Sequence, residues 1–123
     1  MFWNFSCFIH HIYIYIYIYA IKTKLNPNYD FNKIIPIYKN KINELDNKIL
    51  NLLEERNRLS NKIGQCKKNM NKEVEDKDRE YEVLIRLSDN STTICNSELI
   101  KIYREIFNMS TRIQRNSGKF TIN

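Results

Sequence analysis

Two cationic side chains stand where the helical pattern around them calls for apolar ones. Arg56 occupies the heptad slot between Leu52 and Leu59. Lys67 follows eleven residues later, which returns it to within about 20° of the same direction around a helix. Both cations therefore point into one groove. A polar side chain on a buried stripe needs either a protein partner or a ligand, and two cations would suit a small anion.

Two later segments repeat this pattern with other polar groups. Glu80 lies on an apolar helical face, with Asp76 one turn before it. Ser110 and Gln114 are four residues apart and continue an apolar stripe of the last segment. One interpretation is structural, with a buried arginine that sets coiled-coil register, a glutamate that pairs with it, and Asp76 as a helix cap. The other is a cavity for a dianion that carries a hydroxyl group. The pattern alone leaves both open.

Helices must position these residues, and the chain predicts an all-α fold of three. Gly and Pro are scarce, with two of each. The first predicted helix follows Pro36 and runs from about Ile37 to about Met70, roughly 50 Å at the helical rise of about 1.5 Å per residue. Its apolar residues follow the 3-4 heptad spacing of a seam that faces another helix. The seam residues are Ile42, Leu45, Ile49, Leu52, Leu59, Ile63, Cys66 and Met70. A small chain cannot cover this seam, which predicts an intertwined homodimer.

Two shorter helices follow. The second has Asp76 as its expected cap and runs to about Ser88. The third starts near Asn96 or Ser97, both competent caps, and ends near Asn116. Each of the three helices therefore brings polar groups into an otherwise apolar interior.

The rest of the chain flanks this helical domain, which we assign to residues 37–116. Residues 1–36 are expected to be a low-complexity N-terminal extension and linker, and residues 117–123 a frayed tail. Ile12–Tyr19 alternates Ile with Tyr, which is a strand by periodicity but is also the translation of an AT-rich repeat. Asn26-Pro27-Asn28 is typical of a turn.

Composition limits where the protein works and what it binds. Polar residues break the N-terminal apolar run, so membrane contact through residues 1–21 is disfavoured, and no basic stretch or cleavage site favours a secretory signal. The net charge of +6 comes from 20 basic residues interleaved with 14 acidic ones, which argues against a nucleic-acid surface. The three cysteines have neither disulfide nor zinc-ligand spacing. We therefore expect a cytoplasmic protein without a metal.

Five short motifs, in order, carry a resemblance to a known family. They are Ile42-Asn-Glu-Leu-Asp46, Leu52-Leu53-Glu-Glu-Arg56, Ile63-Gly64-Gln-Cys-Lys67, Asp76-Lys-Asp-Arg79-Glu80 and Ser110-Thr-Arg-Ile-Gln114. Their order and spacing resemble the AroQ-type chorismate mutases, the all-helical chorismate mutase type II domain, from about Lys39 to Gln114. The match needs no gap between Lys39 and Glu80. One such motif would be weak evidence for the family, whereas five in this order and at these spacings are a specific signal.

The resemblance implies a fold and an activity. Members are homodimers of three-helix chains whose long first helices pair, and each active site takes residues from both subunits. They rearrange chorismate to prephenate in phenylalanine and tyrosine biosynthesis, without a metal or cofactor. The reaction breaks a C–O bond and forms a C–C bond with no proton transfer, so it needs no nucleophile or base. Positioned charges are enough to fold the substrate and to stabilise the charge that develops.

The resemblance also implies three catalytic residues. Arg56 would grip a substrate carboxylate. Lys67 would reach the ether oxygen and a carboxylate, and Gln114 would donate to the same ether oxygen. Negative charge develops on that oxygen as the C–O bond breaks, so preorganised donors there lower the barrier.

Five further positions would bind the substrate. Asp76 and Glu80 would hold the ring hydroxyl, while Ser110 and Arg79 would complete the carboxylate site. The family's first arginine, which comes from the other subunit, aligns with Lys39. This is a departure, because lysine keeps the charge but loses the planar fork that grips a carboxylate with two parallel bonds. Weaker substrate binding is the expected consequence.

Three questions stay open at this point. Lys41 stands near Lys39 and could take its place. An isochorismate pyruvate lyase has the same fold and a similar pocket, and spacing does not separate it from a chorismate mutase. A catalytically inactive helical dimerisation protein is the third interpretation, and the retained polar residues argue against it.

Overall fold

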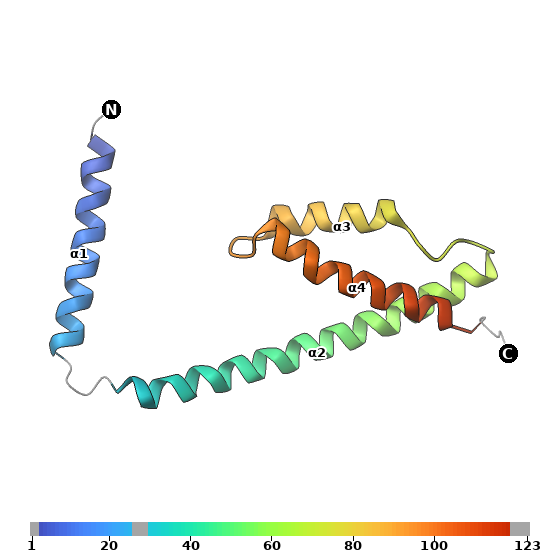
Figure 1. Cartoon of the computed structure of the whole chain (residues 1–123), viewed down its shortest axis with the longest axis horizontal. Helices are drawn as coiled ribbons and strands as arrows, with labels where there is room; N and C mark the ends of the chain where they lie inside the picture. The colour runs from blue at the N-terminus through green and yellow to red at the C-terminus, as the bar shows by residue number, and fades with distance from the viewer. Residues whose placement is uncertain (1–2, 26–29, 119–123) are drawn as a thin grey trace. The chain divides into compact units, whose positions relative to one another are not determined.

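The protein is helical throughout the part that its structure describes. The computed structural model describes residues 3–25 and 30–118, with the side chains of residues 9–22 and 30–118. Those residues form four helices and their connections, without a strand, which confirms the all-α prediction and adds one helix to the three expected (Figure 1). The chain divides into two compact units, Met1–Asp46 and Asn47–Asn123.

Helix α1 spans Trp3–Leu25, so the strand periodicity of Ile12–Tyr19 was misleading. A helix satisfies its own backbone hydrogen bonds, whereas a single strand leaves its N–H and C=O groups without partners. Strict alternation spreads Ile and Tyr around the helix, and the side chains of Tyr13–Tyr19 are all exposed. The predicted turn at Asn26–Asn28 lies outside the described residues. No helix in the described ranges is long and apolar enough to cross a membrane.

Helix α2 spans Phe31–Asn69 and begins six residues before the predicted start. Asp30 begins it, because its Oδ1 accepts the N–H of Asn32 at 3.0 Å and its carbonyl accepts two further amides. Pro36 therefore lies inside the helix, where it removes one backbone donor without ending the helix.

The other end of α2 has the geometry of a Schellman motif. Asn71 takes a left-handed conformation with φ 53°. Its N–H donates to the Lys68 carbonyl at 3.2 Å, and the N–H of Lys72 donates to the Lys67 carbonyl at 2.9 Å. This end fixes where the connection to the next helix leaves α2.

Helices α3, Lys77–Asn90, and α4, Asn96–Asn116, form an antiparallel pair (Figure 1). Asp76 caps α3 as predicted, and its Oδ1 accepts the N–H of Arg79 at 3.0 Å. The cap of α4 is Cys95 and not Asn96 or Ser97, which are already helical. Glu98 makes this possible because its carboxylate accepts the Cys95 N–H at 3.1 Å, the reciprocal half of a capping box.

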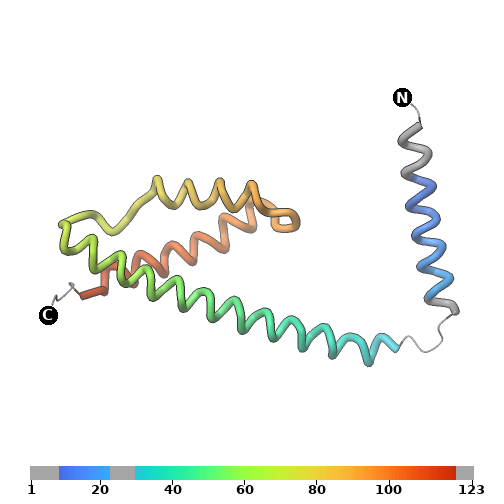
Figure 2. The backbone as a smooth tube through the Cα atoms, turned by 180° about the vertical axis from the view of Figure 1, so that it is seen from behind, coloured from blue at the N-terminus to red at the C-terminus, as the bar shows by residue number. Residues whose placement is uncertain are grey.

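The C-terminal end of α4 lies against the second half of α2, as Figures 1 and 2 both show. The contact centres on Gly64, where an added Cβ would lie 2.6 Å from Gln114 Cα. Ser117, expected in a frayed tail, is instead 3 % exposed. Its hydroxyl donates to the Gln114 carbonyl at 2.6 Å, and Lys68 Nζ donates to its carbonyl. Residues 119–123 of the predicted tail lie outside the described part.

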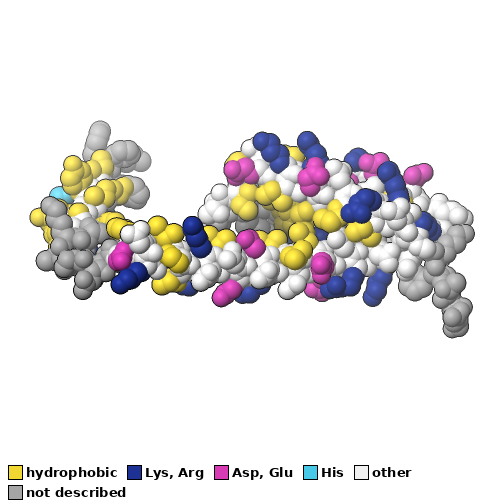
Figure 3. Space-filling model, turned by 60° about the horizontal axis from the view of Figure 1, so that its bottom comes forward, with side chains coloured by type: hydrophobic (Ala, Val, Ile, Leu, Met, Phe, Trp, Pro, Cys, Tyr) yellow, Lys and Arg dark blue, Asp and Glu magenta, His cyan; other side chains and the backbone are white. Residues whose placement is uncertain are grey.

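Few apolar side chains are buried in the described chain. Only Val83, Leu99 and Phe107 belong to its core. The predicted seam of α2 is open, with its Ile, Leu and Met side chains 49–65 % exposed. Figure 3 shows apolar side chains along the surface of α2 between charged ones. Such a helix face needs a further apolar surface to cover it.

Candidate active site

A cavity of about 400 Å³ lies within the second unit, with walls from α2, the start of α3 and α4. It brings together seven of the eight positions singled out from the sequence. These are Arg56, Lys67, Asp76, Arg79, Glu80, Ser110 and Gln114. Three cations and two carboxylates thus share a small space with a hydroxyl and an amide, so the cavity carries a net positive formal charge.

Arg56 enters the cavity from α2 with neutral groups as its neighbours. Its Nη1 donates to Ser110 Oγ, and its guanidinium carbon lies 5.9 Å from the centre of the Phe107 ring. Among the described residues, no carboxylate forms an ion pair with it. Its charge is therefore available to an anion.

Ser60 is a functional candidate that the sequence reading missed. It is buried, lines the cavity and donates to Ser110 Oγ at 3.2 Å, so it helps to hold the hydroxyl that Arg56 contacts. The sequence does indicate this position, because Ser60 lies four residues after Arg56 and therefore on the same face of the helix.

Lys67 holds the connection between α2 and α3. Its Nζ donates to the Val74 carbonyl at 2.8 Å, which uses one of the three N–H bonds of the ammonium. The other two have no protein partner among the described residues. Because the connection fixes the ammonium, the donor does not have to be ordered when a ligand arrives.

The start of α3 contributes three polar residues in different states. One carboxylate oxygen of Asp76 accepts the N–H of Arg79 and so caps the helix. Arg79 reaches the cavity wall, but its Nη1 is 2.8 Å from Oε1 of Glu82, so a ligand would have to compete with that exposed ion pair. Glu80 has Oε2 at 3.1 Å from Lys77 Nζ.

Gln114 comes from the last turn of α4, beside the crossing at Gly64. Its Oε1 is buried and has no hydrogen-bond partner in the described structure. A buried polar atom without a partner is uncommon and costs free energy. Because Oε1 is an acceptor, only a ligand group that donates a hydrogen bond would satisfy it.

The cavity also has apolar walls, and the sequence predicted two of these residues, Leu59 and Ile63, as part of the seam. The walls come from Leu59, Ile63, Val74, Val83 and Phe107. Apolar walls exclude water, and an ionic contact is stronger where water is excluded. Periodicity marks such residues as apolar but does not tell a cavity wall from a packed core.

Lys39, the eighth position, lies on α2 within the first unit and is exposed. It does not line the cavity of the second unit. Lys41 is also exposed, and its Nζ lies 5.8 Å from the centre of the Tyr38 ring. Both lysines are thus free to act outside this chain's own cavity.

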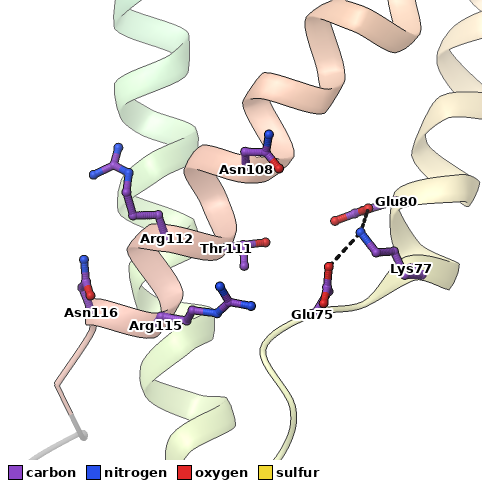
Figure 4. A pocket seen from close by; sticks show the side chains of 8 residues that line it. All are labelled: Glu75, Lys77, Glu80, Asn108, Thr111, Arg112, Arg115 and Asn116. Atoms are coloured by element: carbon purple, nitrogen blue, oxygen red, sulfur yellow. Dashed lines mark hydrogen bonds and ion pairs between the residues drawn. The ribbon is translucent and has the colours of Figure 1, made fainter.

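A second cavity, of about 360 Å³, adjoins the first and shares Glu80 and Thr111 with it (Figure 4). Lys77 lies there between two carboxylates, with Nζ 2.8 Å from Glu75 Oε1 and 3.1 Å from Glu80 Oε2. Its hydrogen bond to Glu75 lowers the pKa of that carboxyl. The pKa of the Lys77 ammonium is raised, mainly by the hydrogen bond to Glu75 and then by the one to Glu80.

Fold and cavity together define a small helical domain whose cavity is lined by three cations, two carboxylates and neutral polar groups. The model of the chorismate mutase type II family matches residues 38–115, which is more than half of the chain. The protein therefore belongs to the chorismate mutase type II family. No curated protein and no solved structure matches the chain.

Proposed function

We propose that this protein is a chorismate mutase that converts chorismate to prephenate, in the biosynthesis of phenylalanine and tyrosine. One observation carries the proposal. Seven positions chosen from sequence motifs, spread over 59 residues from Arg56 to Gln114, line one cavity of about 400 Å³. The family match supports the reaction class.

The substrate's two carboxylates are the anions that the cavity's cations would hold. Arg56 takes one of them, because its guanidinium has only neutral protein neighbours. Holding the carboxylate folds the enolpyruvyl arm over the ring, which removes much of the entropic barrier to an intramolecular reaction. Ser110, held by Ser60, orients the guanidinium for this contact.

Lys67 and Gln114 act on the bond that breaks. As the C–O bond lengthens and the new C–C bond forms, negative charge grows on the ether oxygen. Lys67 donates a free N–H to it, and the Gln114 amide donates a second hydrogen bond through its NH₂ group. Both donors are in place before the reaction, so they stabilise the transition state without reorganisation.

The start of α3 binds the ring hydroxyl. Glu80 accepts its hydrogen bond with the oxygen that Lys77 leaves free, and Asp76 supports it from the helix cap. Arg79 leaves Glu82 to complete the carboxylate site, an exchange that costs little because the Arg79–Glu82 pair is exposed.

The active form is a homodimer with two shared sites. The exposed apolar face of α2 and the small core of the described chain support this state. A second copy of α2 covers the seam. Its Lys39 enters the cavity in the place that the family's arginine from the other subunit occupies. Lys41 is the substitute if Lys39 does not reach.

Incubation of the purified full chain with chorismate tests the proposal, with isochorismate in a parallel reaction. We expect prephenate from chorismate and no salicylate from isochorismate. Salicylate without prephenate would identify an isochorismate pyruvate lyase instead. Neither product, from a protein shown to be folded by circular dichroism, would point to the inactive dimerisation protein.

A further inference from the structure

Lys77 lies within the Asp76–Glu80 motif but is not one of the eight predicted site positions, and it does not line the candidate active cavity, yet it contacts Glu80 of that cavity. It is the first residue of α3, and its side chain is 72 % exposed. A lysine at this point is locally unfavourable, because it meets the positive end of the helix dipole. The two carboxylates it contacts, Glu75 and Glu80, offset that cost (Figure 4).

Glu80 is the residue that links Lys77 to the site. Its side chain is 21 % exposed, and it lines both the candidate active cavity and the adjoining one. Lys77 lines the adjoining cavity but not the candidate active one, so it approaches the carboxylate from outside the active cavity. Figure 4 shows Lys77 on one oxygen of Glu80 while the other oxygen points away from it.

A carboxylate in this cavity has an electrostatic cost for the proposed substrate. Two anionic groups of the ligand would meet the negative charge of Glu80 in a space of about 400 Å³, where repulsion is screened less than in water. A cation fixed on the far side of the carboxylate reduces that repulsion. It also restricts the rotation of the carboxylate, which leaves one oxygen to accept from a hydroxyl group.

We propose that Lys77 is a positioning residue, which holds Glu80 from outside the active cavity, orients its free oxygen toward the substrate hydroxyl and offsets its charge. The role rests on the proposed function, because it presupposes a hydroxylated anion in the cavity. Glu75 competes with Glu80 for the same ammonium group. It therefore sets how strongly Lys77 acts on the site.

Steady-state kinetics of Lys77→Met test this role. We expect the KM for chorismate to rise about three- to fivefold, in keeping with an ion pair that has one solvated partner, with a smaller change in kcat. Lys77→Arg should keep the wild-type KM, and Glu75→Gln should lower it, because Glu80 then no longer competes for the ammonium group. Lys101→Met is the matched control, because Lys101 is an exposed lysine that lines none of the described cavities.

A double-mutant cycle separates positioning from general attraction of the substrate. In a Glu80→Gln background, Lys77→Met should have no further effect on KM, because the group that Lys77 holds is gone. An equal rise in both backgrounds would overturn the proposal and leave only long-range attraction. A rise with Lys101→Met as large as with Lys77→Met would overturn it as well.

A readout without turnover distinguishes this proposal from the proposed function. The ¹³C chemical shift of the Glu80 carboxyl, assigned by its loss in Glu80→Gln, should move in Lys77→Met and stay unchanged in Lys101→Met. A wild-type protein that makes no prephenate would refute the proposed function. An unmoved Glu80 signal in Lys77→Met, or an active wild type without coupling in the cycle, would refute the role of Lys77 alone.

Discussion

Arg56 shows how a charged side chain can be held in a cavity by neutral groups. Its contacts are a serine hydroxyl and an aromatic face, and in the described chain no carboxylate neutralises it. Ser110 has a second partner in Ser60, so removal of Arg56 would not leave the serine hydroxyl unsatisfied. The structural reading of Arg56 and the ligand reading therefore predict different mutant behaviour.

Arg56→Ala should lower turnover of chorismate by about two orders of magnitude or more, the usual cost of losing one preorganised charged or donor group. Helical content should stay near that of the wild type, because no protein carboxylate loses its partner. Enzyme assay and circular dichroism on the same samples check this. Arg58→Ala, at an exposed position outside the cavity, is the control. An Arg56 variant that unfolds would assign the residue a structural role.

Gln114 sets the expected pH dependence of the proposed reaction. Its amide does not titrate, so activity of the wild type should be nearly flat from mildly acidic to mildly alkaline pH. A carboxylic acid at this position donates only when protonated, and its unperturbed pKa is about 4.3. Burial raises that pKa because it disfavours the charged form.

Gln114→Glu should therefore stay active in acid and lose activity as the pH rises through the pKa of the new carboxyl. Profiles of kcat/KM against pH for both proteins, over the range where each is folded, measure this. The midpoint of the loss reports the pKa. Identical profiles would mean that residue 114 does not contact the reacting oxygen.

At the scale of the elements, the crossing of α2 and α4 places the amide of Gln114. Gly64 lets the two helices approach so closely that an added Cβ would lie 2.6 Å from Gln114 Cα and 2.8 Å from Gln114 O. Those are backbone atoms, which cannot move aside as a side-chain end can. Any side chain at residue 64 must therefore push α4 away from α2.

Gly64→Ala should lower both stability and activity. In an ordinary helix this change would add up to about 1 kcal/mol of stability, whereas overpacking here should cost about 1–3 kcal/mol. Thermal unfolding and kcat together check the result. Gly118→Ala is the control, because nothing lies within 4 Å of its added Cβ. A Gly64→Ala protein with wild-type stability would show that the helices do not need this approach.

At the scale of the whole molecule, the main feature is the apolar seam of α2, which the described chain leaves exposed. The described chain buries only three apolar side chains, while Ile42, Leu45 and Ile49 are each more than half exposed. A domain with so small a core gains little from folding alone. Folding and dimerisation are therefore expected to be coupled.

Ile49→Glu should disrupt the proposed dimer and, with it, helical content and activity, because a charge in an apolar seam has no partner there. Sedimentation at micromolar concentration and circular dichroism measure both effects. Asn51→Glu adds the same charge on the opposite face of α2 and should change neither. A wild-type protein that sediments as a stable folded monomer would contradict the dimer.

The sequence by itself determined the helical class, the Asp76 cap and seven polar residues of the cavity. These follow from local rules, namely hydrophobic periodicity, side-chain capping and motif spacing, which act within a few turns of one helix. Local rules failed at the helix starts. Pro36 is tolerated within α2 because Asp30 begins the helix earlier, and Cys95 caps α4 because Glu98 reaches back to its amide.

Only the tertiary structure decided which groups are already engaged. Arg79 pairs with Glu82, Lys77 holds Glu80, and the oxygen of Gln114 is buried without a partner. The close crossing at Gly64 and the burial of Ser117 also depend on the tertiary structure. These features depend on distances between helices that are far apart in the chain. Periodicity along one helix fixes a direction for each side chain, but it does not fix what another helix places in front of it.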